Sequence, residues 1–176
     1  GFGCRMIAYD LYEKDSVKKY AQYVDLDTLF AESDIITLHA PATAESYHMI
    51  DDRVIERMKE GVGIVNCARG SLIDSDALIR GIESRKIGFA CLDVVEHESG
   101  LYYFDRMGEP LNNPRLAILR SYANVIVTSH MAFYTDEAVR PHAVVQLSHG
   151  MCEYIGRYDD FAAYLCARGY AVCGND

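Results

Sequence analysis

The sequence has no apolar run that approaches the ~20 residues needed by a membrane-spanning helix. Its first residues, Gly1-Phe2-Gly3-Cys4-Arg5, contain no long apolar region, so the sequence shows no secretory signal peptide. It also has no basic stripe, because 17 Lys and Arg residues face 26 Asp and Glu residues and the formal net charge is −9. These absences argue against an association with a membrane and against binding to nucleic acid.

The six cysteines include no CxxC pair, and the sequence has no internal repeat and no low-complexity segment. In a chain of 176 residues, cysteines spaced in this way are typical of reduced thiols rather than of a disulfide framework. We therefore expect a cytoplasmic location, and we predict no metal site. Half of the residues are hydrophobic, which is enough for a sizeable core.

Short apolar runs alternate with helical patterns along most of the sequence. The runs predicted to be strands are residues 5–9, 35–38, 62–65, 87–92 and 124–128. Between them lie amphipathic stretches, and the stretch from residue 74 begins with the helix-capping side chains Asp74 and Ser75. Continuous apolar strands separated by helices predict an α/β fold with a parallel sheet covered on both faces.

Two regions depart from this alternation. Residues 94–123 contain two glycines and two prolines and are predicted to form a long irregular insertion, which is typical of a functional loop. Apolar residues at helical spacing predict a longer helix from about residue 135 to residue 155. The tail from 157 to 176 is rich in Tyr, Ala and Cys, and its role is open.

Chemically capable side chains follow the predicted strands, at Asp10, His39, Arg69, Asp93 and His130. The carboxyl ends of parallel strands lie on one edge of a sheet, where ligands bind in open α/β folds. An arginine there can hold a carboxylate through two parallel hydrogen bonds. Each residue alone also fits a structural role, such as a surface arginine or a buried histidine, but together they predict an active site.

The segments at these strand ends read Tyr9-Asp10, Leu38-His39-Ala40-Pro41, Asn66-Cys67-Ala68-Arg69-Gly70, Leu92-Asp93-Val94-Val95-Glu96-His97-Glu98 and Thr128-Ser129-His130-Met131-Ala132-Phe133-Tyr134. As a set they resemble the D-isomer-specific 2-hydroxyacid dehydrogenases, over about residues 1–156. The run from His130 to Thr135 is most similar to the branch that contains D-lactate and D-2-hydroxyisocaproate dehydrogenases.

This resemblance implies a doubly wound parallel sheet, a Rossmann-like NAD-binding domain, over residues 1–133. Residues 134–176 would be a C-terminal helix and tail that belong to the substrate domain. The glycine-rich turn that precedes this region in the family is not supplied by Gly1-Phe2-Gly3-Cys4-Arg5-Met6. We therefore expect the domain to be truncated at its N-terminal side, with an open sheet edge that favours dimerisation.

The resemblance also assigns catalytic roles to Arg69, Glu98 and His130. Arg69 would hold the substrate carboxylate, and His130 would exchange a proton with the carbonyl oxygen. Glu98 would orient the imidazole and favour its protonated form. Glu96 is the competing acid, but the family's glutamate lies five positions after the aspartate, which selects Glu98. Glu96 is then left either solvated or bound to its loop, and Tyr134 is expected beside Arg69 and His130 at the substrate.

The implied cofactor is NAD. A carboxylate at Asp10 can accept hydrogen bonds from ribose hydroxyls and would repel the additional phosphate of NADP. By the same resemblance, the residues expected to line the cofactor are Tyr9, Asp10, Ala40, Pro41, Ser46, Cys67, Arg69, Asp93 and His130.

The predicted function is hydride transfer between NAD and a small D-2-hydroxy or 2-keto acid, in a homodimer without a nucleic-acid or membrane partner. Two alternatives remain open. The family has relatives that act as NAD-sensing corepressors, so the chain could be a binding module without catalysis. It could also be an inactive fragment, because the glycine-rich turn and most of the substrate domain are missing.

Overall fold

The protein is described by a computed structural model whose described residues are 3–102, 108, 110, 112–132, 144–148 and 171–175. The chain forms two compact units. The first comprises residues 1–102 and 109–130, and the second comprises residues 103–108 and 131–176. No helix among the described residues is both long enough and apolar enough to cross a membrane.

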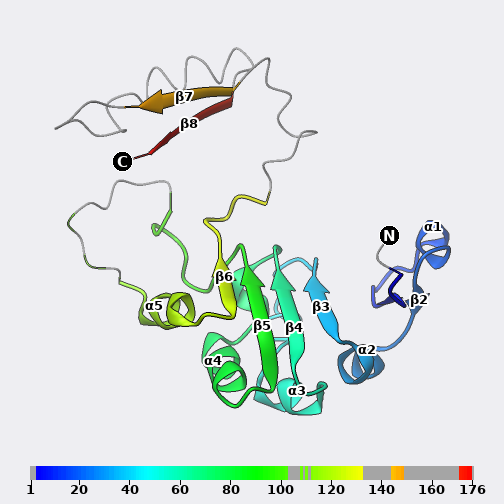
Figure 1. Ribbon diagram of the computed structural model, residues 1–176. Coiled ribbons are helices and arrows are strands. Elements are labelled where there is room, and N and C mark those ends of the chain that lie inside the picture. The colour runs from blue at the N-terminus through cyan, green and yellow to red at the C-terminus, as the bar shows by residue number, and fades with distance from the viewer. Residues whose placement is uncertain are drawn as a thin grey trace. The chain divides into compact units, whose positions relative to one another are not determined.

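A parallel sheet is the centre of the first unit (Figure 1). Its strands are β3 (Ile35–Leu38), β4 (Val62–Asn66), β5 (Ile87–Leu92) and β6 (Val125–Val127), and they pair in this order. Four of the five predicted runs, 35–38, 62–65, 87–92 and 124–128, are therefore adjacent parallel strands, and the predicted α/β fold is confirmed.

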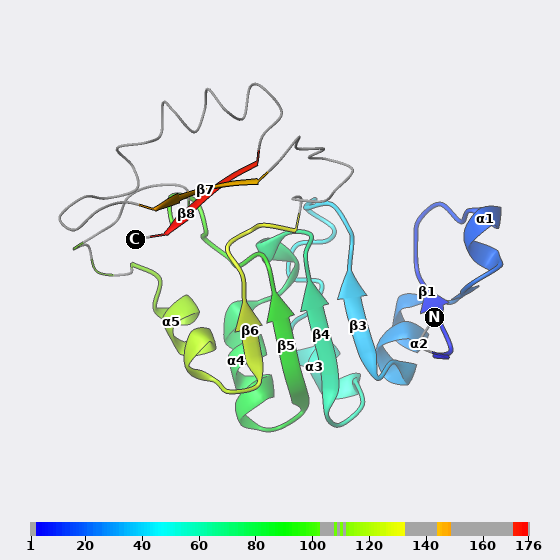
Figure 2. The same cartoon turned by 45° about the horizontal axis from the view of Figure 1, so that its top comes forward.

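Helices connect these strands and form a layer in which each helix contacts the next (Figure 2). They are α2 (Leu26–Glu32), α3 (Asp52–Arg57), α4 (Ser75–Glu83) and α5 (Pro114–Ser121). A side chain at the preceding residue caps the first amides of each helix, namely Asp25, Asp51, Asp74 and Asn113. These caps satisfy backbone donors that the helix itself leaves without partners.

The two faces of the sheet differ in burial. One row across the strands, beginning with Ile36 and Ile64, is buried in the core together with Leu78 of α4. The next row lies on the opposite face, and its side chains at Thr37 and Ile126 are exposed. In a doubly wound fold both faces carry helices. Among the described residues of this unit, the helices α2 to α5 bury one face.

A small two-stranded parallel sheet precedes α2. It consists of β1 (Ile7–Ala8) and β2 (Gln22–Tyr23), which are joined through the four-residue helix α1 (Asp15–Lys18). The predicted strand over residues 5–9 is thus shorter than expected. Asp10 still follows this strand, as predicted.

The second unit contains the parallel strand pair β7 (Val144–Ser148) and β8 (Ala171–Asn175). The helix predicted from residue 135 to residue 155 is therefore wrong over residues 144–148. Val144 and Val145 have branched β-carbons, which favour an extended backbone. Each of these residues pairs with a residue of β8 that lies 27 positions further along the chain, as Val144 does with Ala171, and local periodicity does not reveal such partners.

The region 94–123, predicted to be irregular, contains helix α5. Its start combines two signals, an Asn113 side chain that accepts a hydrogen bond from the amide of Leu116 and a proline at the first helical position. Proline is common at this position because its missing N–H would have no helical partner there.

Candidate functional site at the carboxyl edge of the sheet

Four strands of the central sheet end on the same edge. One row of the register contains Leu38, Asn66, Leu92 and Val127. Arg69 follows this row after β4, Glu98 follows it after β5, and His130 follows it after β6. Neighbouring strands lie about 4.8 Å apart. The sheet therefore brings together the loops that carry the predicted catalytic residues, as well as His39 after β3.

Asn66 organises the turn that carries Arg69. Its side chain is 1% exposed, its Nδ2 donates to the carbonyl of Arg69 at 2.9 Å, and its Oδ1 accepts from the amide of Ala68 at 3.0 Å. Gly70 follows with its α-carbon against the next loop, where an added Cβ would lie 2.2 Å from the carbonyl of Val95. Arg69 is exposed and extended at the top of this turn, and its Nη1 donates to the Ala68 carbonyl at 2.6 Å.

His130 forms a pair with Glu98. Its Nδ1 lies 2.9 Å from Oε1 of Glu98, and the two side chains are 32% and 22% exposed. The second oxygen of Glu98 accepts a hydrogen bond from the amide of Val95 at 3.2 Å, which fixes the carboxylate on its own loop. The structure thus places Glu98 beside the imidazole. This arrangement can orient a histidine for proton transfer.

Asp93 joins the ends of three strands. Its amide donates to the carbonyl of Asn66 at 2.9 Å, and its carbonyl accepts from the amide of His130 at 2.8 Å. Its carboxylate, in a residue that is 4% exposed, accepts a hydrogen bond of 2.5 Å from the hydroxyl of Thr128. Asp93 was predicted to line the cofactor, and its described contacts connect the strands that carry Arg69, Glu98 and His130.

Glu96 binds two other segments of the unit instead of His130. Its Oε1 lies 2.6 Å from Nε2 of His48, and its Oε2 accepts a hydrogen bond of 2.8 Å from the amide of Ser75 at the start of α4. Burial raises the pKa of Glu96, but the hydrogen bonds from His48 and Ser75 outweigh burial and hold that pKa below its ordinary value. Sequence analysis did not identify His48, which lies in a loop. The presence of Glu96 as a second acid close to Glu98 was the one feature of the sequence that indicated a need for another partner.

Two residues predicted at the cofactor, Tyr9 and Asp10, follow β1, which pairs with β2 in a separate small sheet and not with the central sheet. Asp10 is exposed after β1, and its carboxylate accepts a hydrogen bond of 2.9 Å from the amide of Tyr12. Tyr9 is 41% exposed. An exposed carboxylate shortly after a strand can accept hydrogen bonds from the hydroxyls of a ribose. Asp10 therefore fits the ribose of NAD.

Three further cofactor residues, Ala40, Pro41 and Ser46, lie in the loop after β3. The hydroxyl of Ser46 donates to the carbonyl of Pro41 at 2.7 Å, and Ala40 packs against the core. After β4, Cys67 is exposed, and partial burial together with the nearby Asp93 carboxylate raises the pKa of its thiol. Tyr134, predicted at the substrate, lies outside the described residues.

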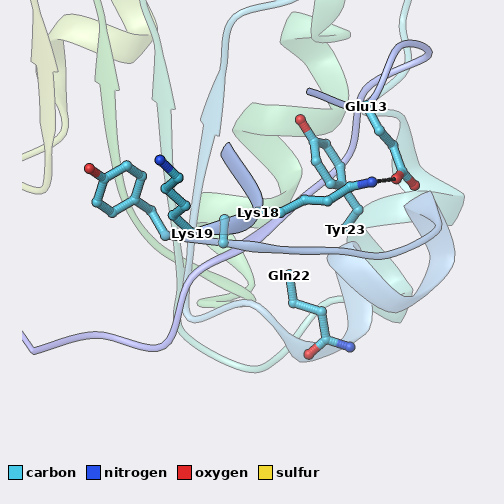
Figure 3. Close-up of a pocket in the computed structure, with 7 residues that line it drawn as sticks. Glu13, Lys18, Lys19, Gln22 and Tyr23 are labelled. Carbon is cyan, nitrogen blue, oxygen red and sulfur yellow. Dashed lines mark ion pairs between the residues drawn. The ribbon is translucent and has the colours of Figure 1, made fainter. Parts of the chain in front are cut away.

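A hollow of about 540 Å³ lies apart from these residues, beside the small sheet (Figure 3). It is lined by Glu13, Lys18, Lys19, Tyr20, Ala21, Gln22 and Tyr23. Lys18 points to Glu13 and pairs with it at 3.0 Å. None of the described residues predicted for the site lines this hollow. We therefore do not assign the hollow to the candidate site.

Metal ligands do not gather in the part of the chain that the structure describes. It contains no group of three or more His, Cys, Asp and Glu side chains that could hold an ion. The candidate site therefore consists of a guanidinium, an imidazole and carboxylates, which together can bind an anionic substrate and transfer a proton.

Two families match separate parts of this chain. Residues 1–132 match the family described as D-isomer specific 2-hydroxyacid dehydrogenase, NAD binding domain. Residues 139–176 match a different family, described as serine aminopeptidase, S33. The two matches do not overlap, and the boundary between them falls within the second structural unit.

Individual relatives match most of the chain with a minority of their own length. An aromatic 2-oxoacid reductase from Clostridium sporogenes is 51% identical over 140 residues, which are 79% of this chain and 42% of that protein. A D-lactate dehydrogenase from Treponema pallidum has a TM-score of 0.74 and 40% identity, over 77% of this chain and 41% of that one. A D-lactate dehydrogenase from Aquifex aeolicus, solved with NAD and lactic acid, has a TM-score of 0.71 and 38% identity, over 78% and 42%. The chain thus spans about two fifths of the length of these relatives.

Proposed function

The chain belongs to the D-isomer-specific 2-hydroxyacid dehydrogenase family, and we propose that the full-length protein transfers hydride between NAD and a small 2-hydroxy or 2-keto acid of D configuration. The observation that carries this proposal is the pair of His130 and Glu98, at 2.9 Å, on the sheet edge that also carries Arg69. An oriented imidazole and a guanidinium at one edge suit a substrate that has a carboxylate beside a reducible carbonyl.

Each catalytic residue has a distinct role in this proposal. Arg69 binds the substrate carboxylate in two parallel hydrogen bonds and draws electron density from the adjacent carbonyl. His130 donates a proton to the carbonyl oxygen during reduction and takes it back during oxidation. Because Glu98 engages Nδ1 of His130, the proton transfer falls to Nε2. Tyr134 contributes to the substrate pocket.

NAD supplies the hydride when it is bound. We assign its ribose hydroxyls to the carboxylate of Asp10, which also disfavours the additional phosphate of NADP. The other residues assigned to this cofactor are Tyr9, Ala40, Pro41, Ser46, Cys67, Arg69, Asp93 and His130. All of them except Tyr9 follow β3, β4, β5 or β6 of the central sheet, whereas Tyr9 follows β1 of the separate small sheet.

The decisive experiment is an assay of the full-length protein with NADH and either pyruvate or phenylpyruvate. We expect oxidation of NADH, and in the reverse direction oxidation of D-lactate in preference to L-lactate. His130→Ala should lower the rate of keto-acid reduction at least ~10²-fold, the effect typical of losing a general acid. Near-normal reduction by this variant across the whole pH range would exclude His130 as the proton donor.

A homodimer in the cytoplasm is a further part of the proposal. It is supported by the exposed apolar side chains on the outer strands of the sheet, where Ile35 and Ile126 are 59% and 61% exposed. Unpaired edges and exposed apolar strands favour association with a second copy. Light scattering after size exclusion would test this, and a monomer at high concentration would contradict it.

Residues 134–176 have two competing assignments. Their assignment to the substrate domain of the dehydrogenase stays a prediction. The match of residues 139–176 to the serine aminopeptidase family and the parallel pair β7-β8 instead favour a separate structural unit. Limited proteolysis with mass spectrometry would distinguish them, because a separate unit should be released by cleavage between residues 131 and 143 while residues 1–130 stay protected.

A further inference from the structure

We propose that His48 and Glu96 form a positioning pair that holds the loop 95–98 where Glu98 can engage His130. This inference rests on the proposed dehydrogenase function, since it concerns how the same site is held together. His48 and Glu96 do not touch the reacting atoms in this proposal. They act through Glu98.

The first step of the argument is the number of segments that Glu96 joins. One oxygen of its carboxylate binds His48 at 2.6 Å, and the other accepts from the Ser75 amide at 2.8 Å. Its backbone carbonyl accepts a hydrogen bond of 3.1 Å from Nδ2 of Asn113, the residue that caps α5. The loop after β5 is therefore attached to the loop that carries His48, to α4 and to α5.

The second step is that the pair is shielded from solvent. The side chain of Glu96 is 10% exposed and that of His48 is 27% exposed. The ring of Tyr47 stacks on the imidazole, with centroids 3.9 Å apart and an angle of 16° between the planes. A charged hydrogen bond with little solvent around it is stronger than one at the surface, and losing one partner leaves the other poorly solvated.

The third step connects Glu96 to Glu98 within one confined loop. The backbone at Val95 and Glu96 packs directly on Gly70, which limits where this loop can lie. Glu98 accepts a hydrogen bond of 3.2 Å from the amide of Val95, and its other oxygen lies 2.9 Å from Nδ1 of His130. A shift of about 1 Å in such a group can lower a reaction rate ~10²-fold.

The first test compares His48→Ala with His48→Gln in the full-length protein. Both variants put an ordinary side chain at a backbone φ of +50°, but only glutamine retains an N–H near the former Nε2. We expect His48→Ala to lower kcat for keto-acid reduction roughly ten-fold or more with little change in KM, and His48→Gln to recover most of this loss. His97→Ala is the control, because His97 is exposed, lies in the same loop as Glu96 and also has a positive φ, +55°.

The second test is a double-mutant cycle with Glu98→Gln. If His48 acts through Glu98, His48→Ala should have little additional effect on kcat once Glu98 is replaced, within about two-fold. If the two losses in kcat multiply, His48 has an independent structural role and the proposal is wrong. Wild-type kcat for His48→Ala, or equal losses in His48→Ala and His97→Ala, would also overturn it.

The third test does not require activity. In protein with ¹⁵N-labelled histidine, the Nδ1 resonance of His130 reports its hydrogen bond to Glu98, and we expect His48→Ala to shift it while His97→Ala leaves it in place. Glu96→Gln, which loses one acceptor of Glu96, should shift it as well. A wild-type protein that reduces no 2-keto acid would remove the proposed function, and an unchanged His130 resonance in both variants would remove the positioning pair.

Discussion

Side chains at the carboxyl edge of the sheet have two different kinds of role. Arg69 and His130 carry the proposed chemistry, whereas Asn66 and Asp93 bind the backbone and the strand ends beside them. The first kind could be predicted from the sequence, because a guanidinium or an imidazole after a strand has an evident chemistry. The second kind could not, since the partners of Asn66 depend on how a turn folds.

The same contrast explains the two glutamates. The sequence alone could not decide between Glu96 and Glu98, since both are acids in one loop. The choice of Glu98 depended on the spacing that the family shows. The structure separates them by their partners, because Glu96 binds His48, a residue 48 positions away in the sequence, and Glu98 lies beside His130. Such a distant contact leaves no local pattern that sequence analysis could detect.

Arg69→Lys tests whether the guanidinium is needed for its shape as well as for its charge. Lysine keeps the positive charge but cannot form two parallel hydrogen bonds with a carboxylate. We expect KM for the keto acid to rise and kcat to fall, with a combined loss in kcat/KM of roughly ten- to hundred-fold, the range expected for a charged hydrogen bond. Arg57→Lys is the control, since Arg57 pairs with Asp27 on the helix layer. Equal kcat/KM values for Arg69→Lys and the wild type would show that charge alone is sufficient.

Gly70→Ala tests the close approach of two loops. A Cβ at this position would overlap the carbonyl of Val95 at 2.2 Å, and that neighbour is backbone, which cannot rotate away. We expect the free energy of unfolding to fall by about 1–3 kcal/mol, the usual cost of forcing additional atoms into a packed site. Ser71→Ala, one position further along, is the control in denaturant titrations. A Gly70→Ala variant as stable as the wild type would show that the two loops can separate at little cost.

Helices and strands were predicted best where the sequence pattern is compatible with only one type of secondary structure. The apolar runs at 35–38, 62–65 and 87–92 are strands within a residue of their expected bounds, because short apolar runs that contain β-branched residues and are bounded by turns favour an extended backbone. The prediction failed at residues 144–148, where two valines and a leucine fit a helical stripe as well as a strand. It also failed at α5, which begins among prolines and is stabilised by its Asn113 cap.

The contribution of the N-cap of α4 to the free energy of unfolding can be predicted. The carboxylate of Asp74 accepts hydrogen bonds from the amides of Asp76 and Ala77 at 2.9 and 3.2 Å. Asp74→Ala removes both, and we expect a loss of about 1 kcal/mol in the free energy of unfolding, as for other helix caps. Glu56→Ala, at an exposed position inside α3, should change stability by less than about 0.5 kcal/mol. Urea titrations of both variants measure the difference, and equal stabilities would show that water replaces the cap.

Several carboxyl groups of the first unit have a pKa below the ordinary value because they accept hydrogen bonds from the protein. The amides of Thr28 and Val54 hold the pKa values of Asp25 and Asp51 below their ordinary value of 3.8. The guanidinium of Arg115 lowers the pKa of Asp76 in the same direction. Asp25 and Asp51 cap the starts of α2 and α3, and Asp76 joins α4 to α5 through Arg115, so the ionisation of these groups is linked to the stability of the helix layer.

We therefore expect this protein to be destabilised by acid. A carboxyl group whose pKa is lower in the folded state binds fewer protons there than in the unfolded state, so stability is fully present above the unfolded pKa and falls as the pH drops toward the folded pKa. With ordinary values of 3.8 for Asp76 and 4.5 for Glu96, the loss should begin below a pH of about 5 and continue downward. Urea titrations at successive pH values would measure it, and Asp76→Asn should flatten part of the dependence because asparagine does not titrate. Stability that stays constant or rises between pH 5 and pH 3 would contradict the assignment of these carboxylates as stabilising partners in the folded state.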